Sequence, residues 1–139
     1  MSVPVAKDIM TTDLITVKTD TPIYKVMEFV AKHDISGVAV VEDDMTLVGI
    51  LSEKDMINLV RTPQDYERKT VNDFMTQPAL YFEENESLLD VCDFLKKNVF
   101  RRVPITAKGK LVGIISIRDI IEYILRLKGN VPVSADLPE

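Results

Sequence analysis

Two ten-residue stretches of the chain carry the same chemically active residues at the same spacing. Residues 47–56 read LVGILSEKDM and residues 111–120 read LVGIISIRDI, so an apolar run with an internal Gly leads to Ser-x-x-Asp in both. A strand that ends at a helix N-terminus presents free amides and a favourable dipole, which together bind phosphate. An acidic side chain at such a turn can accept hydrogen bonds from sugar hydroxyls. The pattern therefore indicates a nucleotide site, present twice.

The same pattern has a purely structural alternative. Ser52-x-x-Asp55 and Ser116-x-x-Asp119 both fit a capping box, in which the Ser hydroxyl accepts from a helix amide and the acid meets the positive end of the helix dipole. Taken alone, each pattern is more typical of a cap than of a ligand site. The preceding strand and the basic residue directly before each Asp favour a nucleotide.

The elements that position these residues form a duplicated unit of about sixty residues. A shift of 65 aligns Met10 and Thr11 with Met75 and Thr76, and the shift becomes 64 after the turn before Leu111. Hydrophobic periodicity predicts the order β-α-β-β-α in each copy. The predicted strands are 14–17, 37–41 and 46–51, then 79–82, 102–106 and 110–115; the predicted helices are 22–33, 53–60 and 117–127, with an apolar stripe over 88–95.

Two details of this pattern extend the prediction. Thr21 stands where it would cap the first long helix, with Pro22 at the first helical position. Cys92 lies on the apolar stripe and is expected in the core, not as a nucleophile.

The predicted fold class is α/β (α+β), with two β-α-β-β-α repeats packed sheet against sheet about a pseudo-twofold axis. A sixty-residue unit buries too little surface to be robust alone, so the copies should form one module. We expect the first repeat at 3–62, a linker at 63–69, the second repeat at 70–127 and a flexible tail at 128–139.

Composition excludes several classes of function. The 139 residues are 46% hydrophobic and 28% charged, with no apolar run long enough for a membrane helix and no signal peptide, so a cytoplasmic protein is expected. One Cys and one His give neither an internal disulfide nor a metal cluster, so no metal site is expected. The net charge of -5 argues against nucleic-acid binding. Residues 1–65 carry 6 basic and 11 acidic side chains, whereas residues 66–139 carry 11 of each, which makes the second half the better anion site.

The whole pattern resembles a known family. The runs DIMT, ITV and TP before an amphipathic helix, followed by RRVPI and KLVGIISIRDI, are similar to a tandem pair of cystathionine β-synthase (CBS) domains, the free-standing Bateman module. The resemblance covers about residues 3–127. It implies that an adenosyl ligand lies between the copies, with the ribose Asp from one copy and the adenine walls from the other.

Carried over residue by residue, the resemblance implies a main cleft around Asp119. Asp119 would bind the ribose, Ser116 the ribose or first phosphate, and Arg102, assisted by Arg101 and Arg118, the phosphates. An arginine fork suits phosphate because it can pair with two oxygens at once. The adenine walls of this cleft would be Met10, Thr11, Ile15 and Ile35.

A second, weaker cleft is implied around Asp55. There the positions equivalent to the arginine pair are Ser36 and Gly37, so Lys54 is the one local phosphate contact expected. The implied set for this cleft is Ser52, Lys54, Asp55, Met75, Thr76, Leu80 and Phe100.

These features predict a regulatory module that binds AMP, ADP or ATP, requires no cofactor and is not an enzyme, since no nucleophile with a base and oxyanion donors is recognisable. The module accounts for nearly the whole chain, so its output is expected through a homodimer or an unknown regulated protein, without nucleic acid or membrane insertion. The alternatives are a structural scaffold with vestigial clefts, and a binder of S-adenosylmethionine, NAD or a cyclic dinucleotide.

Overall fold

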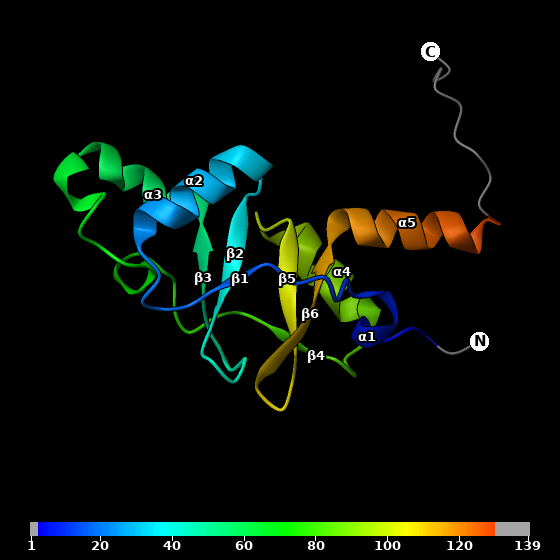
Figure 1. The fold of residues 1–139 in the computed structure, drawn as a ribbon. Helices are drawn as coiled ribbons and strands as arrows, with labels where there is room; N and C mark the ends of the chain where they lie inside the picture. The colour runs from blue at the N-terminus through cyan, green and yellow to red at the C-terminus, as the bar shows by residue number, and fades with distance from the viewer. Residues whose placement is uncertain (1–2, 130–139) are drawn as a thin grey trace, which may run out of the picture.

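The computed structural model describes residues 3–129 and contains two three-stranded sheets flanked by helices (Figure 1). No helix within this range has the length and apolar character needed to cross a bilayer. The predicted tail at 128–139 lies almost entirely outside the described residues. The elements, in chain order, are α1 (Ala6–Ile9), β1 (Thr16–Val17), α2 (Ile23–His33), β2 (Gly37–Val41), β3 (Leu47–Ser52), α3 (Glu53–Met56), three 3-10 turns (Ile57–Val60, Pro63–Asp65 and Val71–Asp73), β4 (Phe82–Glu83), α4 (Leu88–Lys97), β5 (Arg102–Ala107), β6 (Lys110–Ser116) and α5 (Ile117–Leu127).

The two sheets have the same topology. In the first, β1 pairs with β2 in parallel and β2 with β3 as an antiparallel hairpin; in the second, β4, β5 and β6 repeat this order. Each hairpin also carries a register shift at its equivalent place, after Val40 and after Ile105. The predicted β-α-β-β-α duplication is thereby confirmed.

The repeats exchange their first segments. Thr11 bridges to Ile114 of β6, and Thr76 bridges to Ile50 of β3, which is the same contact after the 65- and 64-residue shifts. A second reciprocal pair joins Val5 to Ser87 and Thr70 to Pro22. These bridges are thus reciprocal between the repeats, as a pseudo-twofold relation requires.

The exchange also decides which residues build each core. The first core combines α2, β2 and β3 with Val71, which belongs to the second sequence repeat and is fully buried. The second combines α4, β5 and β6 with Ala6 and Ile9 of the first repeat. A third cluster joins the two sheets directly, through Ala39 and Val41 of β2 and Leu111 of β6. Each packed core therefore differs from the sequence repeat, because it contains the first segment of the other repeat in place of its own.

Local predictions were wrong at three places. The long helix of the first repeat starts at Ile23, and Thr21 does not cap it; the Thr21 hydroxyl accepts from the Lys18 amide at 3.1 Å. The first strands are shorter than predicted, because only Thr16–Val17 and Phe82–Glu83 find a partner strand. The helix predicted over 53–60 is α-helical only to Met56 and continues as a 3-10 turn.

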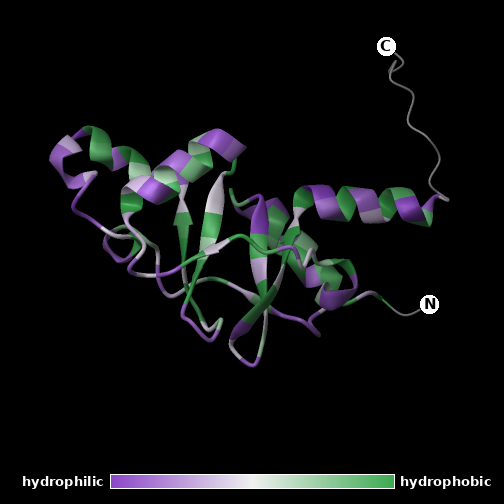
Figure 2. Ribbon diagram, viewed as in Figure 1, coloured by the Kyte–Doolittle hydropathy of each residue, from purple (hydrophilic) through white to green (hydrophobic). Residues whose placement is uncertain are grey.

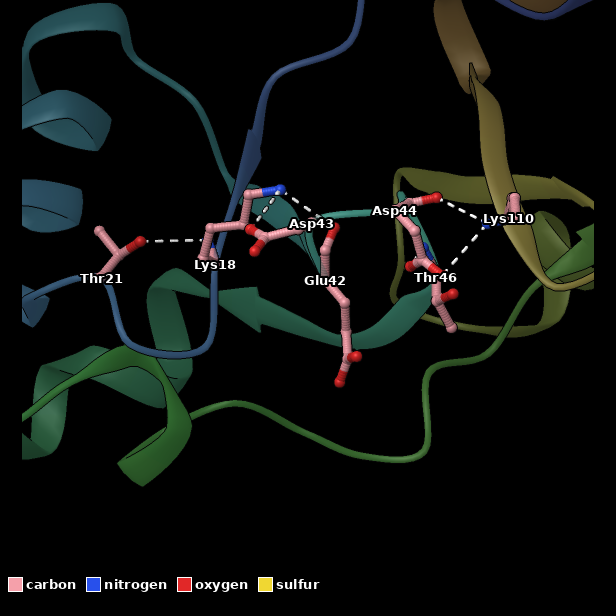
Figure 3. Close-up of polar contacts among 7 residues, drawn as sticks. All are labelled: Lys18, Thr21, Glu42, Asp43, Asp44, Thr46 and Lys110. Carbon is pink, nitrogen blue, oxygen red and sulfur yellow. Dashed lines mark hydrogen bonds and ion pairs between the residues drawn. The ribbon is translucent and has the colours of Figure 1, made fainter.

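A polar contact holds the tip of the first hairpin against β6 (Figure 3). Lys110 donates from Nζ to the Asp44 carbonyl at 2.9 Å and pairs with its carboxylate at 3.2 Å. Lys18 approaches the same turn from the other side, donating to the Glu42 carbonyl at 3.0 Å. Backbone bonds from Leu47 and Leu111 continue the contact across the two repeats. The hairpin tips are therefore tied at the end of the sheets opposite the Ser-x-x-Asp helices.

The Asp44 contact predicts a specific pH response. Hydrogen bonds from Thr46, and then Lys110, lower the pKa of Asp44 from 3.8 to about 2. Because the folded-state pKa lies below the unfolded one, the contact stabilises the fold above about pH 4 and its contribution is lost as the pH falls towards 2. We expect Thr46→Val and Lys110→Met each to raise this pKa in a carboxyl-detected NMR titration. An unchanged midpoint in both variants would contradict the contact.

The first segment of the second repeat approaches β3 so closely that it explains the Gly at position 49 of the first motif. A Cβ on Gly49 would lie 2.7 Å from the Thr76 carbonyl oxygen, which is backbone and cannot rotate away. Gly49→Ala is expected to lower the free energy of unfolding by about 1–3 kcal/mol, the usual cost of overpacking, as measured by urea denaturation. Gly109→Asn is the control, because a Cβ there meets nothing within 4 Å and Asn tolerates the positive φ of 81°. A loss as large at Gly109 would refute the steric explanation.

Candidate functional site

Both Ser-x-x-Asp motifs form the helix caps that their spacing allows. The Ser52 amide donates to Asp55 Oδ2 at 2.8 Å, and the Ser52 hydroxyl accepts from the Asp55 amide at 3.3 Å. Ser116 and Asp119 repeat these bonds at 2.8 and 3.1 Å. The structural alternative is thus confirmed, and one oxygen of each carboxylate is committed to the cap.

The second oxygen of each carboxylate faces the other repeat. Thr76 Oγ1 donates to Asp55 Oδ1 at 3.3 Å, and Thr11 Oγ1 donates to Asp119 Oδ1 at the same distance. A carboxylate oxygen has two lone pairs, and these single bonds are long. Each Oδ1 therefore retains the capacity to accept from a sugar hydroxyl.

Asp55 opens into a cavity of about 500 Å³ between the repeats. The cavity is lined by the starts of β2, β5 and α3. The first repeat contributes Ser36, Gly37, Val38, Ala39, Ile50, Ser52, Glu53, Lys54 and Asp55; the second contributes Thr76, Pro78, Ala79, Leu80, Phe94, Val99, Phe100, Arg101, Arg102, Val103, Pro104 and Ile114.

Three cations stand in the lining of this cavity. Lys54, Arg101 and Arg102 are all exposed, and none of them makes an ion pair with any residue in the range 3–129. Their charges are therefore available to an anionic ligand. Asp55 supplies an acceptor within the same cavity.

The apolar wall of the cavity is unusually open. Leu80 is 55% exposed and Phe100 is 43% exposed, although both are large hydrophobic side chains. The Phe100 ring is nearly parallel to the Phe94 ring, with 5.9 Å between the centroids and an interplanar angle of 6°, and this contact holds it in place. Such a wall suits a flat, apolar ring system.

The prediction that the Asp55 cleft lacks the two arginines was wrong, because Arg101 and Arg102 both line its cavity together with Ser36 and Gly37. Arg102 also pairs with Ser116 across β5 and β6, and the Arg101 carbonyl accepts from the Ile117 amide, so the expected place of the arginines beside Asp119 stays a prediction. Asp119 and Ser116 do not line this cavity.

Among the other residues predicted for the Asp119 cleft, Thr11 donates to Asp119 and Met10 packs over Gly113 of β6. Ile35 packs against the first core. Ile15 is 42% exposed on the segment before β1 and is outside the cavity lining. Arg118 is engaged with Glu122 at 3.2 Å. Of the residues predicted for the second cleft, all except Met75 line the cavity; Met75 packs under Gly49.

Sequence reasoning missed several lining residues. Ser36, Gly37, Pro78 and Val99 shape the cavity, and Val99 is 81% exposed. An apolar pair, Val99 and Phe100, directly before two arginines is the one signal in the sequence that could have located this wall.

The titratable residues that could act as nucleophiles lie elsewhere. Cys92 packs against the second core, and burial raises the pKa of its thiol, so the reactive thiolate is disfavoured. The expectation that Cys92 belongs to the core is confirmed. Within residues 3–129, no group of three or more His, Cys, Asp or Glu side chains is arranged to hold a metal ion.

Comparison with known proteins defines the family. The CBS domain model matches residues 6–62 and again residues 71–126, so the chain belongs to the CBS domain family. The crystal structure of CBSX2 in complex with AMP has a TM-score of 0.80 to this chain at 30% identity, covering 90% of this chain and 98% of that one. CBSX2 from Arabidopsis thaliana has a TM-score of 0.84 at 28% identity, covering 94% and 100%.

Other relatives place the pair in different contexts. The CBS domain pair of protein MJ0100, solved with 5-methylthioadenosine and S-adenosyl-L-methionine, has a TM-score of 0.71 at 26% identity, covering 93% and 98%. Protein MJ1225 of Methanocaldococcus jannaschii is 30% identical over 85% of this chain and 42% of its own length. Inosine-5'-monophosphate dehydrogenase of Aquifex aeolicus is 36% identical over 78% of this chain and 22% of the enzyme. The chain thus spans less than half of these two relatives.

The cap geometry gives a test that needs no ligand. Ser116→Ala removes the hydroxyl that accepts from the Asp119 amide at the start of α5, and should lower the free energy of unfolding by about 1 kcal/mol. Ser36→Ala is the matched control, because the Ser36 hydroxyl makes no side-chain hydrogen bond with the described residues. Chemical denaturation monitored by circular dichroism measures both. Equal values for the two variants would show that the cap contributes nothing.

Proposed function

We propose that this chain is a regulatory adenine-nucleotide-binding CBS pair whose ligand occupies the Asp55 cavity. The observation that carries the proposal is the combination, in one cavity of about 500 Å³, of a carboxylate oxygen that can accept a further hydrogen bond, three unpaired cations and an exposed aromatic wall. Ligand pockets commonly measure about 300–1,000 Å³, so a nucleotide fits this size class.

The chemistry of the cavity assigns each part of the ligand. Asp55 Oδ1 accepts from the ribose hydroxyls, replacing or sharing the 3.3 Å bond from Thr76. Phe100 and Leu80 pack on the adenine ring, and Arg101, Arg102 and Lys54 pair with the phosphates. The AMP complex of CBSX2 supports this choice of ligand class.

The positive charge of the cavity favours AMP, ADP and ATP over adenosyl ligands without phosphate. The MJ0100 pair was solved with 5-methylthioadenosine and S-adenosyl-L-methionine, neither of which carries a phosphate. Three unpaired cations in the cavity favour a phosphate-bearing compound over a sulfonium, because like charges would meet in the second case. The Asp119 side keeps the same carboxylate and threonine pair, and we propose it as a second site for the adenosyl part.

The module acts by binding, not by catalysis. The cavity lining contains no His or Cys among the described residues, and its one serine next to an acid, Ser52, is committed to the helix cap. A nucleotide that binds one arrangement of the module better than another shifts their populations. The output then passes to a second copy or to a regulated protein.

Nucleotide-dependent melting tests the proposal. At about one hundred times its dissociation constant, a ligand stabilises the fold by roughly 2.7 kcal/mol. We expect AMP, ADP or ATP to raise the melting temperature of the wild type, and the double variant Arg101→Ala/Arg102→Ala and the single variant Asp55→Ala each to remove most of that rise.

Matched variants make the result specific. Asp119→Ala removes an equivalent cap and Arg118→Ala removes an equivalent charge, but both residues lie outside the cavity, so each should keep the nucleotide shift relative to its own ligand-free melting. If Asp119→Ala removes more of the nucleotide-dependent melting shift than Asp55→Ala does, the nucleotide binds in the Asp119 cleft instead. No shift with any nucleotide, S-adenosylmethionine, NAD or a cyclic dinucleotide would leave a scaffold with vestigial clefts.

A further inference from the structure

The Asp55 cavity contains a second carboxylate that the binding mode proposed above does not use. Glu53 stands in the cavity lining, two residues before Asp55. Its side chain is exposed and makes no ion pair with any residue in the range 3–129. The helix cap does not need this side chain either, because Ser52 and Asp55 make the cap between them. Glu53 therefore adds a free negative charge to the cavity.

The fold does not require an acid at this position. The 64-residue shift relates Glu53 to Ile117 of the second repeat. The backbone is used in the same way at both places, because the Glu53 amide donates to the Ser36 carbonyl and the Ile117 amide donates to the Arg101 carbonyl, both at 3.0 Å. An apolar side chain thus satisfies the same backbone geometry. The carboxylate of Glu53 is a property of the cavity and not of the repeat.

Glu53 limits the positive charge that the cavity offers. Figure 2 shows that β5 is hydrophilic at its start and largely hydrophobic beyond it, so its cations are gathered at the cavity end of the strand. Arg101, Arg102 and Lys54 supply three positive charges to the lining, and Glu53 and Asp55 supply two negative ones, which leaves a net charge of +1. A phosphate monoester such as AMP carries a charge of about −2 at neutral pH, and every further phosphate makes the ligand more negative.

We propose that Glu53 restricts the number of phosphates that the Asp55 cavity accepts, so that a nucleoside monophosphate binds more tightly than the di- or triphosphate. This inference rests on the proposed function, because it requires that the phosphates meet the three cations of the lining. The first phosphate is balanced by those cations. Further phosphates find no additional cation in the lining and are repelled by the Glu53 carboxylate, and this repulsion is stronger inside a cavity than in open water.

A bridging metal ion would give Glu53 the opposite effect. Mg²⁺ is commonly held by one or two carboxylates together with ligand phosphates. Here one oxygen of Asp55 is committed to the helix cap and the other accepts from Thr76, which leaves Glu53 as the one uncommitted carboxylate of the cavity lining. Repulsion of the further phosphates is therefore the effect that this donor set favours, and the experiment below distinguishes the two.

Calorimetric titration of AMP, ADP and ATP in the presence of EDTA tests the proposal. For the wild type, we expect affinity to fall in the order AMP, ADP, ATP. Glu53→Gln removes the charge at nearly unchanged size and should narrow the ratio of AMP to ATP affinity by about fivefold or more, chiefly because ATP binds more tightly. Glu53→Ile, which copies the second repeat, should narrow the ratio in the same direction.

Glu67→Gln is the matched control. It changes the net charge of the chain equally, but Glu67 is exposed, makes no ion pair with the described residues and lies outside the cavity lining, so the wild-type ratio should be kept. Circular dichroism shows that each variant is folded. An equal narrowing in Glu67→Gln would assign the effect to the overall charge of the protein and overturn the role of Glu53.

The remaining outcomes separate this inference from the proposed function. If AMP binds and Arg101→Ala/Arg102→Ala abolishes its binding, but Glu53→Gln and Glu53→Ile keep the wild-type ratio, the inference is overturned and the proposed function stands. If none of the three nucleotides binds the wild type, both are overturned. The titrations are repeated with Mg²⁺ in place of EDTA. Tighter binding of ATP than of AMP under that condition, lost in Glu53→Gln, would make Glu53 a metal ligand and overturn the inference.

Discussion

Reciprocal strand pairing between the repeats is the constraint on which the rest of the structure depends. The Thr11–Ile114 and Ile50–Thr76 bridges insert the first segment of each repeat into the other. The same pairing brings each threonine hydroxyl to the opposite Asp, at 3.3 Å. Cap, hydroxyl and carboxylate are therefore assembled from both repeats, and the geometry of either cleft is fixed by the contact between them.

Within this symmetric frame the side chains are not symmetric. The start of β2 contributes the small residues Ser36 and Gly37 to the Asp55 cavity, whereas the start of β5 contributes Arg101 and Arg102. The same divergence shortens α3 and lengthens α5. The two repeats thus share one backbone topology, and substitutions give their equivalent positions different side chains.

The sequence predicted the repeat, the element order, the span of α5 and both capping boxes, because each depends on periodicity or on residues within one turn. It did not show that Arg101 and Arg102 line the Asp55 cavity, since their neighbours across the cavity, Ser36 and Gly37, are distant in the chain. The end of α3 was missed for a related reason. After α3 the chain folds back so that Tyr66 donates to Glu28 of α2, a tertiary contact that no local pattern records.

The offset between the sequence repeat and the packed core has an evolutionary consequence. Val71 is fully buried in the core of the first half, and Ala6 in that of the second, so each half is completed by residues that a different copy of the unit encodes. A genetic break between the copies would leave both fragments with an open core. Lineages that gain or lose this unit must therefore do so two copies at a time, or recruit another chain to supply the missing segment.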